Sequence, residues 1–421
     1  MNWLFFNPTQ GDSRGDTERW VTGLCQELSL HGDRCLEPPA SSDRGPFRAA
    51  PDFKPDIIMV TGFHAARLAR RSYPDAAIGL HLSRVQAYDD RLFNHRVCNT
   101  CVDRILTDNP AVRIILLQRP WILPGKVAVY PPEAMTQTVR SIMQQAWDAR
   151  RNQCAPVLST PSGRLGLRSS GPVEMDSPIW NESVESELIS RSGHAVVRRL
   201  QYGSETLYIK RFLGRRLSLR RLGLRNPLAV DNFRTAAKLI LRGAAVVPHF
   251  AAGWHLGPGK GDESLLITGT IPGALTLDKW SRLAESRLSG HRGLWRELAV
   301  WLAHLHGAGV ACHDLKASNI LVHQEKDGSL EFILLDLDNC RLRPAHVTDH
   351  DIHRNFHQLF RSFQTIANPP AILLFLAVYR HERGLKRRHM RDLMMEVERR
   401  LHRRGTGYEE LLAVYRAGRN P

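Results

Sequence analysis

Two short apolar runs, each bordered by polar residues, constrain the fold of this chain more than any other feature. The first lies at 312–322 and reads Cys-His-Asp-Leu-Lys-Ala-Ser-Asn-Ile-Leu-Val, and the second lies at 332–338 and reads Phe-Ile-Leu-Leu-Asp-Leu-Asp. Short apolar runs bounded by turn-forming residues are typical of buried β-strands. We therefore expect strands beside a turn, with Asp314, Asn319 and Asp336 placed where the apolar runs stop.

These polar residues suit phosphoryl transfer. A carboxylate such as Asp314 can accept the proton of an attacking hydroxyl, while Asn319 and Asp336 can hold a metal ion on the phosphates of ATP. Asp314 and Asn319 are five positions apart, as in the D-L-x-x-x-N catalytic loop of kinases. An aspartate between apolar runs is more often a turn residue that caps the backbone. The joint spacing with Lys316, Asn319 and Asp336 favours a kinase site over that interpretation.

Three strand-like segments earlier in the chain provide a candidate phosphate-binding lysine. They lie at 188–191, 195–200 and 206–210, and Gly193 is in the first turn between them. Lys210 ends the third segment, where kinases place the lysine that contacts the ATP phosphates. A lysine at a strand end is more often a solvated edge residue, and a lone glycine is no Gly-rich loop. The order of these segments along the chain nevertheless assigns Gly193 and Lys210 to nucleotide binding.

The segment at 232–243 is predicted to be an amphipathic helix that Gly243 ends. Kinases carry on this helix a Glu that pairs with the strand lysine. Here the helix has no Glu, Asp231 is at its start, and Asn232 is near the expected position. The partner of Lys210 is therefore open.

Residues 1–134 alternate between strand and helix patterns. Strands are expected at 3–6, 57–60, 77–80, 105–106 and 126–130. Strands that alternate with helices predict an open parallel sheet. Segments of this region resemble the Rossmann-like first domain of GT-B glycosyltransferases, which mainly contacts the acceptor in that family: 15–20, 54–58, 102–108 and 124–127. Nothing after residue 134 resembles the second domain of such an enzyme, so we do not expect this chain alone to transfer glycosyl groups.

The following region has the composition of a connector. Pro, Ser and Gly are concentrated at 156–163 and 169–172, which argues against a core element. We therefore expect an α/β domain at 1–134, a mobile linker at 135–185 and a second domain at 186–421.

Residues 305–321 and 332–341 resemble the lipopolysaccharide core kinases of the Kdo/WaaP family, and the resemblance extends over roughly 188–363. Those proteins have a bilobal protein-kinase-like fold and use ATP to phosphorylate Kdo or heptose of lipopolysaccharide. By position, the resemblance implies a general base at Asp314, a contact to the transferred phosphate at Lys316, Mg²⁺ ligands at Asn319 and Asp336, and an α/β-phosphate contact at Lys210. His313 replaces the Arg of protein kinases, and we expect it to form structural hydrogen bonds.

The net charge of +16 over 421 residues favours a polyanionic partner. Nucleic acid is not expected, because the chain has no recognisable nucleic-acid-binding motif. Arginines at 211–225 and a basic run at 380–404 are either solvated faces or docking sites for anionic lipid. The expected partner is a lipopolysaccharide core acceptor or another anionic glycolipid, with peripheral contact to the inner membrane through basic segments.

Seven cysteines without regular spacing predict no disulfide framework, and the pair Cys98 and Cys101 lacks further ligands at zinc spacing. Reduced cysteines fit a cytoplasmic protein. No apolar run approaches the roughly 20 residues that span a bilayer. We therefore expect a cytoplasmic protein that contacts the inner membrane only peripherally.

Together these patterns predict an α/β plus α+β protein, with a Rossmann-like half-domain followed by a bilobal kinase-like domain. The expected activity is transfer of the ATP γ-phosphoryl group to a sugar hydroxyl of lipopolysaccharide core, with ATP and Mg²⁺ as cofactors. A pseudokinase scaffold in glycolipid assembly is the alternative, because the glycine turn is minimal and the helix Glu is missing. A protein kinase is a second alternative, which the absence of D-F-G and A-P-E motifs disfavours.

Overall fold

The computed structural model describes residues 1–6, 14–36, 53–60, 63–82, 100–107, 110–117, 122–131, 134–153, 158–159, 164–168, 179, 184–213, 226–255, 263–285, 288–363 and 367–402. The chain forms two compact units. The first comprises Met1–Gly243 and His249–Thr268, and the second comprises Ala244–Pro248 and Gly269–Pro421. The domain borders expected from the sequence stay a prediction.

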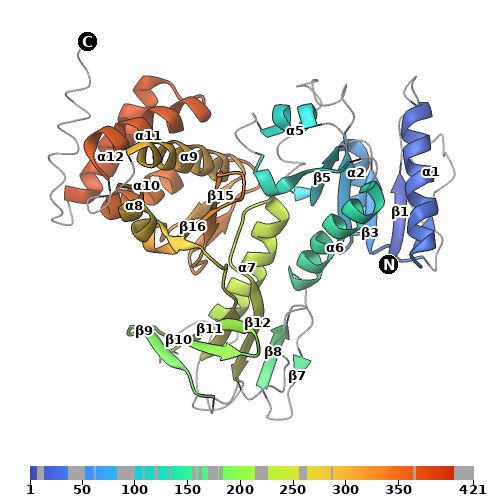
Figure 1. The fold of residues 1–421 in the computed structure, drawn as a ribbon, viewed down its shortest axis with the longest axis horizontal. Coiled ribbons are helices and arrows are strands. Elements are labelled where there is room, and N and C mark those ends of the chain that lie inside the picture. Colours follow the sequence, from blue (N-terminus) through green and yellow to red (C-terminus); the bar gives the residue numbers. More distant parts are fainter. Residues whose placement is uncertain are drawn as a thin grey trace. The chain divides into compact units, whose positions relative to one another are not determined.

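The first unit contains a six-stranded parallel sheet, which confirms the predicted α/β class (Figure 1). Its strands are β1 (Asn2–Phe6), β2 (Arg34–Leu36), β3 (Ile57–Val60), β4 (Ala77–His81), β5 (Arg104–Thr107) and β6 (Val127–Val129). They lie in the order β2-β1-β3-β4-β5-β6. All four residues of β3 are apolar and buried, as expected of a parallel strand with both faces covered.

Helices cover both faces of this sheet. One face packs against α1 (Arg14–Leu30) and α6 (Met135–Gln153), and the other packs against α2 (Phe63–Ser72) and α5 (Pro110–Leu117). A short 3₁₀ turn, η1 (Pro124–Lys126), precedes β6. Helix α6 begins one residue after the predicted α/β domain, and its buried residues join the core of the parallel sheet.

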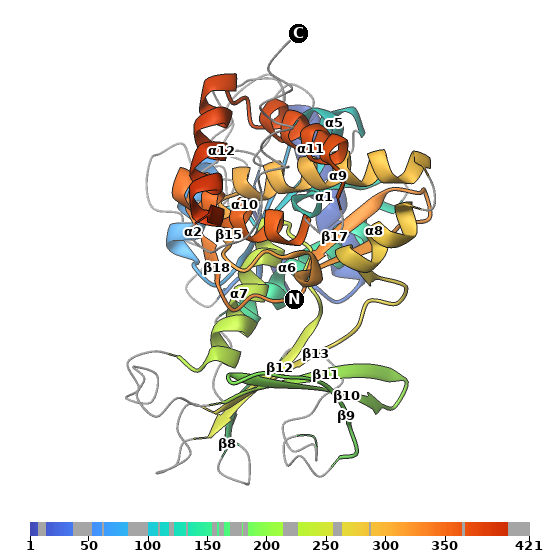
Figure 2. The same ribbon diagram turned by 90° about the vertical axis from the view of Figure 1, so that its left-hand side faces the viewer.

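The first unit also contains a seven-stranded antiparallel sheet, which is seen below α7 in Figure 2. Its strands are β7 (Leu158–Ser159), β8 (Arg164–Arg168), β9 (Glu187–Arg191), β10 (Ala195–Tyr202), β11 (Glu205–Phe212), β12 (His249–His255) and β13 (Ser264–Thr268). Helix α7 (Leu228–Arg242) packs on one face of it. The predicted strands at 188–191, 195–200 and 206–210 are thus present, whereas β7, β8 and β12 were not predicted.

The second unit is mainly helical and carries two small sheets. Its elements are β14 (Leu275–Thr276), α8 (Leu277–Glu285), α9 (Leu288–Gly307), β15 (Val310–Cys312), η4 (Ala317–Asn319), β16 (Ile320–Gln324), β17 (Leu330–Leu334), β18 (Cys340–Leu342), α10 (Asp349–Phe363), α11 (Pro369–Glu382) and α12 (Arg387–His402). Strands β14, β16 and β17 form one sheet, and β15 pairs with β18. Aromatic side chains of α9, α10 and α11 pack edge to face in the core. No helix within the described ranges is long and apolar enough to cross a membrane.

Candidate active site

The first motif forms the connection between β15 and β16 in the second unit. Leu315 and Ala317 are buried and anchor the loop between the two strands. The N–H of Ala317 donates to the Ser362 hydroxyl of α10 at 3.0 Å. A tight turn follows, in which the N–H of Asn319 donates to the carbonyl of Lys316 at 2.8 Å. The loop is therefore held both by apolar burial and by a hydrogen bond that it donates to a neighbouring helix.

Three predicted site residues contact one another in this loop. The Nδ2 of Asn319, which is only 8% exposed, donates to the Asp314 carbonyl at 3.0 Å and to Asp314 Oδ2 at 3.2 Å. The ammonium of Lys316 lies 3.3 Å from the same Oδ2. Both charged side chains remain partly exposed, so the Asp314 carboxylate is oriented by its neighbours and still accessible to a substrate.

Asp336 follows the neighbouring strand, β17. In the antiparallel register Ile320 lies opposite Leu334, and the N–H of Leu335 donates to the Asn319 carbonyl at 3.0 Å. Asp336 is the next residue, and its Oδ1 accepts the N–H of Asp338 at 3.2 Å. The second unit thus brings the ends of both sequence motifs to one pair of strand ends.

Behind the loop, His313 forms the structural hydrogen bonds that were expected of it. Its Nε2 lies 2.9 Å from Oδ1 of Asp351 on α10, and both side chains are buried. Oδ2 of Asp351 accepts hydrogen bonds from Arg343 Nε at 3.0 Å and from the Thr348 hydroxyl at 2.9 Å. Burial alone would raise the pKa of Asp351, but the hydrogen bonds from Arg343, His313 and Thr348 hold it well below its usual range. Burial lowers the pKa of His313.

Sequence reasoning did not identify Asp351. It lies 37 positions after Asp314 in a segment that reads simply as an amphipathic helix. Its hydrogen bond to His313 depends on how α10 packs behind the loop, and no local sequence pattern reports that packing.

Lys210 lies in the first unit, on strand β11. In a strand, alternate residues share a face, so Lys210 lies on the same face as Phe212, which packs with Phe233 of α7. The Lys210 ammonium lies 4.9 Å from the centre of the Phe212 ring, a cation–π contact. Its register partner, Leu266 of β13, belongs to the same core. The lysine therefore lies on the face of the antiparallel sheet that α7 covers.

Gly193 lies in the exposed turn between β9 and β10. The Ser192 hydroxyl accepts the N–H groups of His194 at 3.2 Å and Ala195 at 3.0 Å, which closes the turn. A Cβ atom added at Gly193 would meet no atom within 4 Å. The turn conformation therefore depends on Ser192 more than on the small size of Gly193.

Helix α7 has no Glu, as the sequence shows. Asn232, near the position that would carry it, is 3% exposed and donates through Nδ2 to the Leu228 carbonyl at 3.0 Å. Asp231 accepts a hydrogen bond from Asn226 at 3.2 Å.

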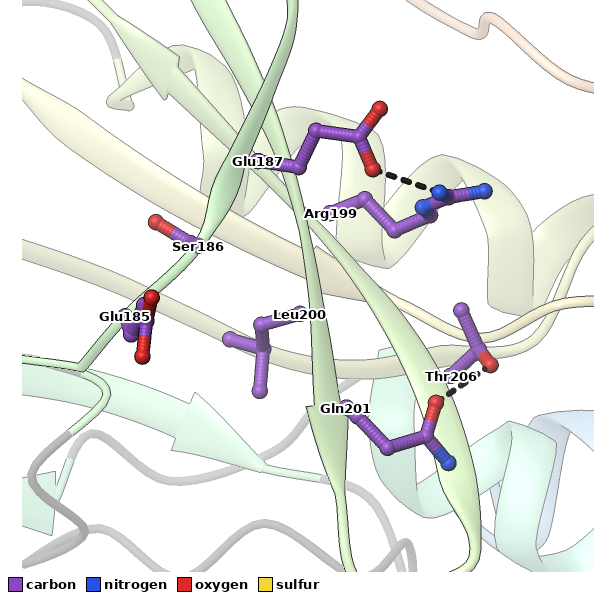
Figure 3. Close-up of a pocket in the computed structure, with 7 residues that line it drawn as sticks. All are labelled: Glu185, Ser186, Glu187, Arg199, Leu200, Gln201 and Thr206. Atoms are coloured by element: carbon purple, nitrogen blue, oxygen red, sulfur yellow. Dashed lines mark hydrogen bonds and ion pairs between the residues drawn. The ribbon is translucent and has the colours of Figure 1, made fainter.

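A polar pocket of about 600 Å³ opens elsewhere on the antiparallel sheet (Figure 3). The ion pair between Arg199 and Glu187, at 2.5 Å, and a 2.9 Å hydrogen bond from the Thr206 hydroxyl to Gln201 border it. These residues lie toward the end of the β10–β11 hairpin where Tyr202 pairs with Glu205. The Gly193 turn is at the opposite end, so this pocket is not the predicted nucleotide site.

The expectation of unpaired cysteines is wrong at one place. Cys312 and Cys340 are opposite each other in the β15–β18 pair and form a disulfide, with Cα atoms 4.0 Å apart. The two residues are 28 positions apart, and no regular spacing reveals that their strands pair. The disulfide links the start of the Asp314 loop to the segment after Asp336.

No group of three or more His, Cys, Asp or Glu side chains with metal-binding geometry occurs among the described residues. Asn319 and Asp336 nevertheless supply oxygen atoms, the ligand type that Mg²⁺ prefers. Because Nδ2 of Asn319 is used on Asp314, its Oδ1 is the atom suited to a metal, and the pair fits Mg²⁺ bound mainly by phosphate and water.

The basic segments are described only in part. Arg211 of β11 pairs with Glu263 at 2.7 Å, whereas the other arginines of the run at 211–225 lie outside the described residues. In the C-terminal run, α12 is described to His402, and its Arg400 pairs with Glu396 at 2.8 Å within the helix.

Two features together define the class of this protein. One is the antiparallel sheet, in which Lys210 lies on the face that α7 covers. The other is the helical unit, in which the loop with Asp314 and Asn319 is followed by Asp336 at the end of the next strand. They are consistent with a kinase-like phosphotransferase fold. Residues 180–379 match the model of the lipopolysaccharide kinase (Kdo/WaaP) family. This part of the chain is a domain of that family, a family of phosphotransferases.

A solved structure with similarity to this chain is described as "WaaP in complex with acyl carrier protein". The identity is 19%, the match covers 54% of this chain and 92% of that chain, and the TM-score is 0.40. No curated protein sequence is detectably similar to this chain.

Proposed function

We propose that the protein transfers the γ-phosphoryl group of ATP to a sugar hydroxyl of lipopolysaccharide core, Kdo or heptose, or of a related glycolipid. The observation that carries the proposal is the Asp314 carboxylate, held by Asn319 at 3.2 Å and Lys316 at 3.3 Å within a domain of the lipopolysaccharide kinase family. A carboxylate held in one orientation near a cation suits in-line transfer to a hydroxyl.

In this mechanism Asp314 is the general base. Its carboxylate orients the attacking sugar hydroxyl and takes up the proton as the oxygen–phosphorus bond forms and ADP leaves. Lys316, which already lies against Asp314, contacts the transferred phosphoryl oxygens and offsets their charge. The Asn319 amide keeps the carboxylate turned toward the hydroxyl.

Asn319 and Asp336 are the proposed Mg²⁺ ligands. When bound there, the ion would neutralise charge on the ATP phosphates. Lys210 is the proposed contact to the α- and β-phosphates, and the Gly193 turn covers the nucleotide. The position of Lys210 beside α7 supports this role, because kinases use the helix that packs on this face to orient the lysine.

The proposed acceptor is an anionic glycolipid, and the net charge of +16 supports such a partner. The use of ATP supports a cytoplasmic location, with peripheral contact to the inner membrane through the basic segments, although the Cys312–Cys340 disulfide removes the argument from reduced cysteines.

Replacing Asp336 tests the site. We expect Asp336→Ala to abolish phosphate transfer from ATP to purified lipopolysaccharide core precursors, because the proposed metal loses its carboxylate. The thermal midpoint should change little, since Asp336 is only partly buried. Radiolabelled phosphate in the glycolipid is the measurement, and unchanged transfer in this variant would contradict the assignment.

A scaffold without catalysis is the second candidate, because α7 carries no Glu. Two measurements separate it from a kinase: ATP binding in the presence of Mg²⁺, and phosphate transfer to a core precursor. A catalytic protein must bind ATP and transfer phosphate, whereas a scaffold shows no transfer to any core precursor.

A further inference from the structure

The last turn of α7 is held by two buried cations from the parallel sheet. The ammonium of Lys126, which is 2% exposed, donates to the Leu241 carbonyl at 2.6 Å and also to the Val102 carbonyl. Arg104, 6% exposed, donates through Nη1 to the Ile240 carbonyl at 3.1 Å. The last carbonyls of a helix lack partners within it and carry partial negative charge, so both cations stabilise this end of α7.

The backbones also approach closely at this point. Gly243 ends α7 with a φ of 87°, and its N–H donates to the Ile240 carbonyl at 2.9 Å. A Cβ atom on Gly243 would lie 2.3 Å from the backbone nitrogen of Lys126, and one on Gly125 would lie 2.8 Å from the Gly243 carbonyl oxygen. Because glycine alone has no Cβ atom, this close approach requires glycine at both position 125 and position 243.

Arg104 is itself held in position, and a separate ion-pair cluster lies beside it. Arg104 Nη1 also donates to the backbone carbonyl of Asp103 at 2.9 Å. The buried carboxylate of Asp103 pairs with Arg70 at 2.6 Å and with Arg150. Burial would raise the pKa of Asp103, but Arg70, Arg150 and Lys126 lower it, so it stays ionised beside Lys126.

The other end of α7 supports the strand of Lys210. The N–H of Ala229 donates to the Ser264 hydroxyl of β13 at 3.2 Å. Val230 and Phe233 pack on Phe212, the residue whose ring lies under the Lys210 ammonium. Helix α7 therefore connects the parallel sheet at its C-terminal end to the lysine's surroundings at its N-terminal end, and α6 lies alongside it (Figure 1).

We propose that Lys126 and Arg104 are positioning residues for nucleotide binding, which they support by holding α7 and, through it, Lys210. In this way the α/β part of the chain contributes to nucleotide binding. The inference rests on the proposed role of Lys210. Helix α7 lacks the Glu that would pair with Lys210. The anchoring of its C-terminal end by Lys126 and Arg104 keeps the helix rigid instead.

A double-mutant cycle on the full-length protein tests the proposal. ATP affinity is measured by calorimetry for Lys126→Met, Lys210→Ala and the double variant. We expect Lys210→Ala to weaken binding by about 10-fold or more, and Lys126→Met by about 3- to 10-fold, with little further loss in the double variant because both act through one group. Arg104→Met should act in the same direction and tests the second cation independently.

Arg70→Met is the matched control. Arg70 is a half-buried cation that pairs with Asp103, but its hydrogen bonds go to Pro74, Ala76, Cys101 and Asp103 and not to α7. It should lower the thermal midpoint as much as Lys126→Met does and leave ATP affinity unchanged. Amide hydrogen exchange at the last turn of α7 should accelerate in Lys126→Met and in Arg104→Met, but not in Arg70→Met.

The outcomes separate the inference from the proposed function. If Lys210→Ala leaves ATP affinity unchanged, the proposed nucleotide site is wrong and the inference fails with it. If Lys210→Ala weakens binding but Lys126→Met and Arg104→Met do not, or weaken it no more than Arg70→Met, the inference alone is overturned.

Discussion

At the scale of single residues, the candidate site depends on Asn319. Its one buried amide serves two neighbours, because Nδ2 holds Asp314 while Oδ1 can face a metal. These hydrogen bonds fix the position of the proposed base, Asp314, relative to the proposed metal ligand, Asn319. A side chain that performs both tasks has few acceptable replacements.

We predict that Asn319→Leu lowers kcat on the order of 100-fold, because it removes both the donor to Asp314 and the oxygen ligand. Asn319→Asp keeps an oxygen for the metal but presents a second carboxylate to Asp314, so it should also lower kcat. Steady-state kinetics with ATP and the core acceptor are the measurement. A kcat for Asn319→Leu within about twofold of the wild-type value would show that Asn319 does not orient the base.

At the scale of secondary structure, the candidate loop depends on pairings between short strands. Strand β15 has only three residues, and its partner β18 also has three. Two such strands gain little from backbone hydrogen bonds alone. The disulfide between Cys312 and Cys340 joins them covalently and closes a loop that contains both sequence motifs.

We predict that replacing both cysteines with serine lowers the free energy of unfolding by about 3.5 kcal/mol, the entropy expected from releasing a 28-residue loop. Urea unfolding with and without reductant is the measurement. Reductant should shift the midpoint of the wild-type protein to that of the double variant and leave the double variant unaffected. A wild-type midpoint that does not respond to complete reduction would contradict the prediction.

At the scale of the whole molecule, buried histidines link stability to pH. His306 is fully buried, with Nδ1 2.7 Å from the Tyr379 hydroxyl. Burial, with the nearby charge of Arg383, lowers its pKa to about 3. His306 therefore stays neutral in the folded protein at a pH where the unfolded chain takes up a proton.

We predict that stability falls as pH decreases from about 6.5 toward 4, because the unfolded state then binds more protons than the folded one. For His306 the slope approaches about 1.4 kcal/mol per pH unit. His306→Asn cannot titrate and should reduce this slope, which urea unfolding at a series of pH values would measure. An equal slope in the variant would show that other groups cause the dependence.

Much of the fold was predictable from local patterns. The apolar run at 57–60 is β3 to the residue, and the predicted run at 206–210 lies within β11, which continues two residues past Lys210. Buried strands need continuous or alternating apolar residues, which is why both were predictable. Strand β2, with one exposed and two partly buried residues, and the two-residue β7 were missed, because segments this short show no clear hydrophobic periodicity.

The sequence by itself determined the chemistry of the site. The spacing of Asp314, Lys316 and Asn319 within one loop, with Asp336 after the next strand, brings them together wherever that hairpin forms, because short-range geometry depends on chain connectivity. Only the tertiary structure decided which contacts hold these elements: the Asp351 hydrogen bond behind His313 and the Cys312–Cys340 disulfide at the Asp314 loop, and, within the first unit, the cations at the end of α7. These contacts join residues 28 to 136 positions apart, and such pairings depend on how whole elements pack rather than on any local pattern.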